Sequence, residues 1–381
     1  MKIVIATDSF KESLSALQAS EQIEAGFREI FPDADYLKFP VADGGEGTVE
    51  AMVAATAGRI VEATVTGPLD EKTSAFYGVT GDDGTAVIEM AAASGLALVP
   101  PAKRNPLQTT SYGTGELIRF ALDAGLGNLI IGIGGSATND GGAGMLQALG
   151  VKLLDREGRD LGFGGGELGR LDRIDSGGLD PRLRDCRIQV ACDVDNPLTG
   201  PDGASRVYAP QKGGTPEMVE ILEHNLAHYA RLIARDLQEE IAAVPGSGAA
   251  GGMGAALLAF LDAELRPGIE IVSEELGLEN AVAGADLVIT GEGCIDRQTI
   301  AGKTPAGVAR IARRHGVPVI ALAGSLSPDA HGVHHYGIDA VFSILSRPCS
   351  LEDALAEAGK NLRTTARNVA AVMKLARTGR I

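Results

Sequence analysis

Hydrophobic and polar positions follow two different rhythms along the chain, and the change between them predicts its organisation. Residues 1–60 read as strand, helix, strand and helix, because short apolar runs alternate with segments whose apolar residues recur at helical spacing. From Ile60 onward, short strands separated by Gly, Pro and Asp turns are typical of antiparallel hairpins. The alternation of strand and helix returns from Asp286. Such a repeat predicts a parallel sheet.

The expected elements divide into strands and helices. Strands are predicted at residues 2–8, 35–41, 59–68, 72–80, 85–91, 128–133, 151–155, 187–194, 286–290, 317–324 and 340–345. Helices are predicted at residues 13–30, 47–57, 216–242, 251–264, 305–315 and 351–378.

The fold class predicted from these elements is α/β with two domains. We expect a doubly wound, Rossmann-like parallel-sheet domain built from both termini, residues 1–60 and 284–381. A mixed α/β domain, residues 61–283, is expected as an insertion. Ligand sites in doubly wound sheets lie beyond the carboxyl ends of the strands, so the chemistry is expected in the loops that follow them.

The charge of the chain limits its partners. A formal net charge of −16 and an isoelectric point near 4.9 argue against nucleic acid and membrane surfaces as partners, since both require a positive field. The first residues reach an acid too soon for a signal peptide, so a cytoplasmic location is expected. The sequence leaves the oligomeric state open, with a homo-oligomer among the options.

Glycine and acidic residues gather where apolar strands end. The stretch GIGGSATNDGGAGMLQALG, residues 132–150, places six glycines in thirteen positions directly after an apolar run. Backbone N–H groups freed of side chains at a helix start can cradle an anion, although a plain turn favours the same residues. The construction recurs, which favours a ligand site over turns alone. The other segments are ATDSFKESLSA, PVADGGEGT, ACDVDNPLTGPDGA, PQKGGT, GSGAAGGMG and VITGEGCIDRQTIAGKTPAGVA.

Carboxylates beside such cradles suit a divalent cation held between protein and phosphate. Mg²⁺ takes one or two carboxylates together with phosphate oxygens, so an acidic protein can bind a polyphosphate without a basic patch. Lys11, Lys212 and Lys303 each stand in or beside a glycine-bearing turn and would supply point charges, although lysines at such places are commonly just solvated.

Two familiar nucleotide signatures fit only in part. AGKTP at 301–305 has the GKT of a P-loop, but Arg297 stands where the first glycine is required. GIGGSA followed by Asp155 resembles a dinucleotide fingerprint and is the strongest rival. Against it, residues 139–142 prolong the loop where the fingerprint requires a helix to have begun.

The same segments resemble the type 1 glycerate kinases, bacterial enzymes that phosphorylate D-glycerate with ATP. The matching motifs, in order, are DSFKESLSA, PVADGGEGT, GIGGSATNDGG, DVDNPLTGPDGA, PQKGGT, GAAGGMG and DLVITGEGCIDRQTIAGK, and they cover essentially the whole chain. The resemblance implies a two-domain α/β fold with the active site in the cleft between domains. It also implies MgATP as donor and phosphorylation of the 2-hydroxyl of glycerate.

Phosphoryl transfer requires in-line geometry, charge neutralisation and an acceptor for the hydroxyl proton, and the residues can be assigned to these tasks. We expect Asp193 as the proton acceptor, with Lys11 and Lys303 as catalytic cations, and Asp43, Glu46 or Asp296 as ligands of Mg²⁺. Substrate-binding candidates are Asp8, Ser9, Lys11, Lys212, Gly44 and Gly45. Candidates for binding ATP are Gly134, Gly135, Ser136, Asn139, Asp140, Gly141, Gly142, Gly291 and Gly293. Asp193 also fits a simple loop cap before Asn196 and Pro197.

Other functions remain open from the sequence. A glycerate kinase that forms 3-phosphoglycerate differs only in how the substrate is oriented. A nicotinamide-dependent oxidoreductase would use the dinucleotide-like loop, and a nucleotide-sensing module would bind ATP without turnover.

Overall fold

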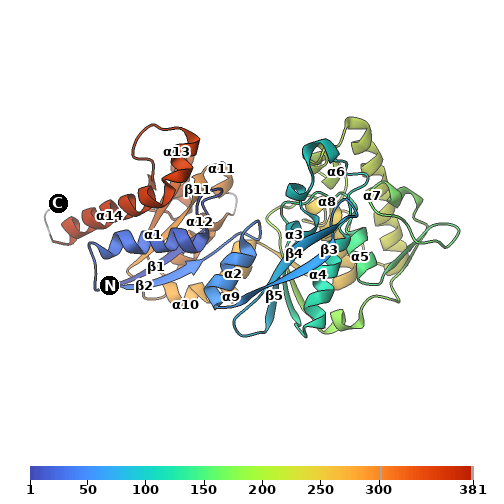
Figure 1. The fold of residues 1–381 in the computed structure, drawn as a ribbon, viewed down its shortest axis with the longest axis horizontal. Helices are drawn as coiled ribbons and strands as arrows, with labels where there is room; N and C mark the ends of the chain where they lie inside the picture. Colours follow the sequence, from blue (N-terminus) through green and yellow to red (C-terminus); the bar gives the residue numbers. More distant parts are fainter. Residues whose placement is uncertain (301–302, 379–381) are drawn as a thin grey trace. The chain divides into compact units, whose positions relative to one another are not determined.

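The computed structural model describes residues 1–300 and 303–378, so Ala301 and Gly302 of the last glycine-rich segment lie outside it, as do residues 379–381. Contacts divide the chain into two compact units. Unit 1 comprises Met1–Asp43, Glu50–Ala57 and Ile269–Ile381, and unit 2 comprises Gly44–Val49 and Gly58–Gly268. Both ends of the chain therefore belong to the same unit (Figure 1).

Unit 1 is built on a five-stranded parallel sheet with the order β13-β12-β11-β1-β2. Because β2 lies on one side of β1 and all later strands lie on the other, the winding reverses between β1 and β11, as in a doubly wound sheet. The strands are β1 (Lys2–Thr7), β2 (Asp35–Pro40), β11 (Leu287–Ile295), β12 (Val319–Leu326) and β13 (Ala340–Ser343).

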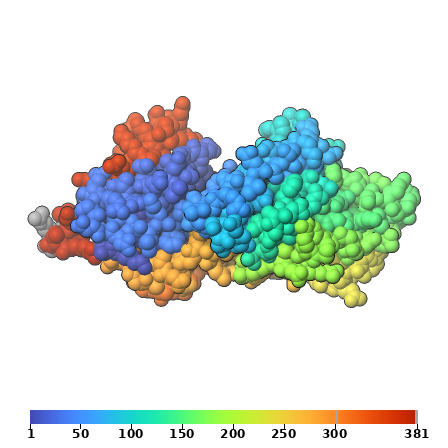
Figure 2. Space-filling model, turned by 60° about the horizontal axis from the view of Figure 1, so that its bottom comes forward, coloured from blue at the N-terminus to red at the C-terminus, as the bar shows by residue number. Residues whose placement is uncertain are grey.

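Helices cover both faces of this sheet. Ile3 and Ile5 pack into a buried cluster with α1 (Ala16–Arg28) and α14 (Ala358–Arg377), while Val4, on the opposite face, is also fully buried. Figures 1 and 2 show these blue and red segments, from opposite ends of the chain, side by side. The other helices are α2 (Thr48–Thr56), α9 (Gly268–Glu275), α10 (Leu278–Val282), α11 (Arg297–Ile300), α12 (Thr304–Arg314) and α13 (Leu351–Ala356).

Unit 2 contains a six-stranded sheet in the order β10-β9-β6-β5-β4-β3. The first four strands in this order are parallel, and the last two add an antiparallel edge. The strands are β3 (Arg59–Thr66), β4 (Lys72–Val79), β5 (Thr85–Glu89), β6 (Asn128–Gly132), β9 (Arg187–Ala191) and β10 (Glu264–Arg266). A separate two-stranded sheet pairs β7 (Lys152–Leu154) with β8 (Arg173–Asp175).

One large core holds unit 2 together. It includes Ile88 and Ile131 from the sheet and Tyr229 from α7, all fully buried. The helices are α3 (Met90–Ser94), α4 (Tyr112–Asp123), α5 (Ala143–Ala148), α6 (Ala204–Tyr208), α7 (Pro216–Leu237) and α8 (Ala249–Leu261). None of the described helices, in either unit, combines the length and apolar character that crossing a bilayer requires.

The predicted α/β class with parallel sheets is confirmed, and several element boundaries are wrong. The first helix begins at Ala16 rather than residue 13, because Ser15 caps it and Gln18 completes the capping box. The long helix expected to reach residue 242 ends at Leu237, since Gln238 adopts a left-handed conformation with φ of 64°. The last helix is two helices, α13 and α14, separated at Glu357.

The largest correction concerns β11. The segment GEGCI was expected as a loop that enters a helix, but the strand continues to Ile295 because it stays paired with β12 as far as Leu326. Glycines allow this close pairing. A Cβ atom on Gly291 would lie 2.2 Å from the carbonyl oxygen of Leu322, so no larger residue fits there. Gly291 and Gly293 are therefore strand residues.

The contact-based division also differs from the expected boundaries in three places, of which the smallest is that residues 58–60 group with unit 2. Residues 44–49 group with unit 2, although the residues on both sides of them group with unit 1. The helices α9 and α10 group with unit 1, because residues from 269 onward pack with the parallel sheet's helices. Gly307 of α12, for example, would place a Cβ atom 2.5 Å from the side chain of Ile269.

Candidate active site

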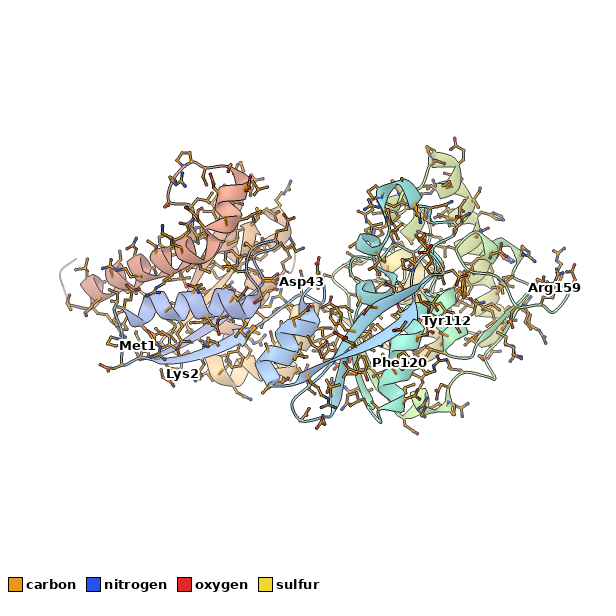
Figure 3. All side chains as sticks on the ribbon, viewed as in Figure 1. Met1, Lys2, Asp43, Tyr112, Phe120 and Arg159 are labelled. Carbon is orange, nitrogen blue, oxygen red and sulfur yellow. The ribbon has the colours of Figure 1, made fainter. Side chains whose placement is uncertain are left out.

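The acidic residues of unit 1 collect where its sheet changes winding direction. Asp8 directly follows β1, and its N–H donates to the carbonyl of Gly291 on β11 at 2.9 Å. Glu292 lies on β11 one residue later, and Asp43, labelled in Figure 3, follows the end of β2. The carboxyl edge at such a reversal is where doubly wound sheets bind ligands. The sequence predicted acids at these strand ends, and the topology brings them to one place.

Asp8 is held in position by two hydrogen bonds. Its Oδ1 accepts from the N–H of Ser9 at 2.6 Å, and its Oδ2 accepts from the hydroxyl of Thr304 at 2.8 Å. Burial, and next the charge of Asp43, raise the pKa of Asp8 to about 6, although both hydrogen bonds and Lys11 act in the opposite direction. The proximity of Asp8 and Asp43 therefore concentrates negative charge.

Glu292 forms the second part of this acidic group. Its side chain is 6% exposed and accepts a hydrogen bond from the hydroxyl of Thr299, and burial raises its pKa to about 7. Thr299 and Asp296 are also linked, because the N–H of Asp296 donates to Thr299 Oγ1 at 3.1 Å and the N–H of Thr299 donates to Asp296 Oδ1 at 3.2 Å. We use the name acidic group for Asp8, Asp43, Glu292 and Asp296.

Two lysines lie near the acidic group. The charge of Lys11 lowers the pKa of Asp8 and that of Lys303 lowers the pKa of Glu292, which places each cation close to its carboxylate. Lys11 is exposed, and Lys303 occupies the N-cap position of α12. The N-terminus of a helix and a lysine beside it both attract anions.

The donor set of the acidic group suits Mg²⁺, which prefers oxygen ligands and needs only one or two carboxylates when phosphate and water complete its shell. Among the described residues, no three His, Cys, Asp or Glu side chains are arranged as a metal site of their own. Of the three predicted ligands, Asp43 and Asp296 belong to unit 1, whereas Glu46 belongs to unit 2 and is exposed.

In unit 2, the four parallel strands end at one edge, and their last residues are followed by candidate binding groups. Glu89 ends β5, Gly132 ends β6, Ala191 ends β9 and Arg266 ends β10. The exposed carboxylate of Asp193 comes two residues after β9, and its Oδ1 accepts from the N–H of Gly268 at 3.1 Å.

The segment Gly44–Val49 crosses three of these strand ends. A Cβ atom on Gly44 would lie 2.2 Å from that of Ala191, and one on Gly132 would lie 2.2 Å from the carbonyl oxygen of Gly44. The N–H of Val49 donates to Oε1 of Glu89 at 2.8 Å. Gly44 is therefore packed against the edge by close contacts that any larger residue would prevent.

The predicted glycine cradle has two parts with different environments. Gly134 and Gly135 are exposed, and a short bend leads from them to the nearly buried Ser136. We call Gly134–Ser136 the glycine tip. In the described part of the chain, the N–H groups of Gly134 and Gly135 donate no hydrogen bond. The tip therefore has the free amides that an anion cradle requires.

The second part, residues 139–142, is buried and its polar groups are used inside the unit. The N–H of Gly141 donates to Gly251, and the N–H of Gly142 donates to the carboxylate of Asp140. A Cβ atom on Gly141 would lie 2.8 Å from the ring of Tyr229. These glycines are required for packing, so their proposed role as a phosphate cradle has no support in the geometry.

Asp140 is the centre of this buried part. It is fully buried, and its carboxylate accepts hydrogen bonds from both the N–H and the hydroxyl of Ser111, at 2.9 and 2.7 Å, and from Gly144. Burial raises the pKa of Asp140, against these hydrogen bonds. Asn139 is also buried and donates to the hydroxyl of Ser205 at 3.0 Å. Both side chains stabilise the loop from inside.

Lys212 differs from the solvated lysine that its sequence context suggests. It is 2% exposed, and burial lowers its pKa to about 7, although the charge of Asp140 acts in the opposite direction. Sequence reasoning also missed Glu89 and Thr304, which contact the two candidate sites. An acid at the end of the apolar run TAVIE and a threonine directly after Lys303 were the available signals.

Comparison with known proteins identifies the family of the chain. A sequence model described as the glycerate kinase family matches residues 3–374. The chain belongs to the glycerate kinase family. Glycerate 2-kinase of Escherichia coli is 60% identical over 98% of both chains, and glycerate kinase of Bacillus subtilis is 59% identical over 99% of both. A crystal structure from Salmonella typhimurium LT2, provisionally named glycerate kinase 2, matches with a TM-score of 0.92 and 63% identity over 99% of both chains.

Proposed function

We propose that this glycerate kinase family member transfers the γ-phosphoryl group of ATP to the 2-hydroxyl of D-glycerate, giving 2-phosphoglycerate and ADP. The observation that carries the proposal is the match over nearly the full length to a relative named glycerate 2-kinase. The acidic group at the winding reversal of unit 1 and the exposed glycine tip of unit 2 support it, because they suit a cation and an anion respectively. ATP as donor also favours a cytoplasmic location.

In the proposed reaction, the hydroxyl oxygen of glycerate attacks the γ-phosphorus while the bond from that phosphorus to the bridging oxygen of ADP breaks. The hydroxyl proton passes to Asp193, whose side chain is exposed and has one oxygen fixed by Gly268. Asp8 is the alternative acceptor, because burial raises its pKa to about 6, toward neutral pH.

The remaining residues bind and orient the substrates. Free amides of the glycine tip would hold phosphate oxygens, and Lys11 and Lys303 would contribute positive charge. Asp8, Ser9, Gly44 and Gly45 are proposed to contact glycerate. Asp43 and Asp296 would hold Mg²⁺, which when bound neutralises phosphate charge.

The test is product identification with purified protein. In the presence of ATP, Mg²⁺ and D-glycerate, ³¹P NMR should show one new phosphomonoester, which enolase converts directly because it is 2-phosphoglycerate. A product that requires phosphoglycerate mutase before enolase would establish 3-phosphoglycerate and contradict the proposed position. L-Glycerate serves as the substrate control.

Absence of ATP consumption with every hydroxy acid would contradict kinase activity itself. In that case thermal shift with ATP and with NAD⁺ separates a nucleotide-binding module from a nicotinamide enzyme. The structure already disfavours the latter, because α5 begins at Ala143, after the glycines rather than within them, and Asp155 is bonded to Arg159.

A further inference from the structure

We propose that Lys212 is a positioning residue, which fixes the glycine tip from inside unit 2 so that its exposed amides are preset for an anionic group of the substrate. The inference rests on the proposed function only in naming the phosphates of ATP as that group. It replaces the expected role of Lys212 as a direct ligand of substrate.

The contacts of Lys212 point to the tip. Its Nζ donates to the hydroxyl of Ser136 at 2.7 Å and to the carbonyl oxygen of Thr138 at 2.6 Å. These two acceptors lie at the end of the tip and just after it, on either side of Ala137. With 2% of the residue exposed, the ammonium group is directed into the protein and away from solvent. It therefore restrains the shape of the loop.

The backbone that carries Lys212 is itself tightly fixed. Lys212 ends a short 3₁₀ turn, Pro210–Lys212, and its N–H donates to Ala209 at 3.0 Å. Gly213, which follows, has φ of 88°, and a Cβ atom there would lie 2.6 Å from the carbonyl oxygen of Arg104. A left-handed glycine in close contact leaves the lysine little freedom, so it can act as a rigid support.

A second attachment holds the other side of the tip. The N–H of Leu96 donates to the carbonyl of Gly135 at 2.8 Å, and the N–H of Ala137 donates to the carbonyl of Ser94 at 2.9 Å. The tip is thus restrained by Lys212 on one side and by residues 94–96 on the other. Its exposed amides are held while they have no hydrogen-bond acceptor among the described residues, which is how a preorganised anion site gains affinity.

The choice of a lysine follows from the acceptors. The hydroxyl of Ser136 and the carbonyl of Thr138 both accept a hydrogen bond from Nζ of Lys212. An apolar side chain at position 212 would leave the carbonyl of Thr138 buried without this donor. The charge of Asp140, which raises the pKa of Lys212, offsets part of the cost of burying the ammonium. The positive charge behind the tip also favours an anion in front of it.

The experiment compares Lys212→Met and Lys212→Arg with Lys103→Met, a control on the surface of the same unit. Hydrogen exchange of peptides that cover residues 133–139 should become faster in Lys212→Met, with the other peptides of unit 2 unchanged. Calorimetric titration should show MgATP binding weakened by about tenfold, the loss expected for hydrogen bonds of this kind. D-Glycerate binding should be unchanged, and Lys212→Arg should recover part of the MgATP affinity.

Each measurement can contradict the proposed positioning role of Lys212. Unchanged exchange at 133–139 in a folded Lys212→Met protein overturns the inference, as does a normal affinity for MgATP. If Lys212→Met does not fold, Ser136→Ala removes one acceptor alone and should raise exchange at the same peptides; if it does not, the inference is wrong. Because the exchange arm needs neither substrate nor turnover, failure of the proposed kinase activity remains distinguishable.

Discussion

The carboxyl edges of the two sheets differ in the groups that they offer to a ligand. Unit 1 gathers charged side chains there, and two of them, Asp8 and Glu292, have raised pKa values because they are partly or fully removed from water near other acids. Unit 2 instead has bare backbone at Gly132, Gly134 and Gly135, and two of its buried charged residues, Asp140 and Lys212, lie behind the loop. The acidic group of unit 1 suits a cation, and the glycine tip of unit 2 suits an anion.

The two edges also differ in what limits their stability. Carboxylates gathered in unit 1 repel one another until a cation or a proton arrives, so that edge is electrostatically strained. Bare backbone in unit 2 carries no such repulsion, but at Gly132 and at the buried glycines behind the tip, such as Gly141 and Gly251, its shape depends on close contacts that leave no room for a methyl group. Charge changes should therefore affect unit 1 most, and volume changes should affect unit 2 most.

The largest expected effect is on catalysis by Asp193, the proposed proton acceptor and an exposed acid on the glycine-rich edge. Asp193→Asn should lower kcat by about 10²–10⁴, the usual contribution of a general base, with the melting temperature unchanged. A coupled assay for ADP measures the rate. Asp202→Asn, an exposed acid further along the same loop, is the control. If Asp8→Asn abolishes turnover and Asp193→Asn does not, the proton acceptor belongs to unit 1.

A methyl group in the buried glycine contacts should have the next largest effect. Gly251 has φ of 68°, and a Cβ atom there would lie 2.1 Å from the carbonyl oxygen of Thr138. Gly251→Ala should therefore lower the free energy of unfolding by about 3 kcal/mol or more, as measured by urea denaturation. Gly158→Ala, with φ of 77° and nothing within 4 Å, should cost only about 1 kcal/mol. Equal decreases in the free energy of unfolding for the two variants would show that the left-handed backbone conformation, and not the contact with Thr138, determines the loss of stability.

Removal of charge from unit 1 should be stabilising, with a pH dependence of known sign. The pKa of Glu292 in the folded protein, about 7, lies above its ordinary value of 4.5. The folded state therefore binds this proton more tightly than the unfolded state does. The resulting stability is fully present below about pH 4.5 and is lost as the pH rises through 7.

Glu292→Gln keeps this position neutral at every pH. The variant should match the wild type near pH 4.5 and exceed it by about 1–3 kcal/mol at pH 8. Thermal melts at several pH values, in buffer with EDTA, measure the difference. Glu21→Gln, at an exposed position on α1, is the control. A gain that does not change with pH would contradict a raised pKa of Glu292 in the folded protein.

The smallest expected effect concerns Ala250, which adopts φ of 53° beside two left-handed glycines at the start of α8. An alanine in the left-handed conformation destabilises the folded state by about 1–2 kcal/mol. Replacing it with glycine removes this strain but also increases the conformational entropy of the unfolded chain, which offsets part of the stabilisation. Ala250→Gly should therefore stabilise unit 2 by about 0.5 kcal/mol. Denaturant titration of the variant and the wild type in parallel measures this difference in the free energy of unfolding. A variant less stable than the wild type would contradict backbone strain at Ala250.

Local pattern was enough to predict much of the fold, because strand and helix periodicity depends on nearby residues. Acids and glycines at strand ends could be assigned to a common edge once parallel strands were predicted. The environment of each glycine could not be predicted. Gly134 and Gly141 look alike in sequence, yet only the second meets Tyr229 from a helix far along the chain. The burial of Lys212 could not be predicted for the same reason, since its partners lie more than seventy residues away.

Strand order in unit 1 has a consequence for how the chain is made. In the described sheet β1 lies between β2 and β11, with Ile3 paired to Leu287, so until β11 is synthesised β1 has β2 beside it but not its second neighbour. On the ribosome, all of unit 2 emerges before that partner exists. During most of translation, β1 therefore cannot form its ladder with β11, and its apolar residues are accessible to chaperones and to non-native contacts. Unit 2, by contrast, has all the strands of its sheet before β11 is synthesised.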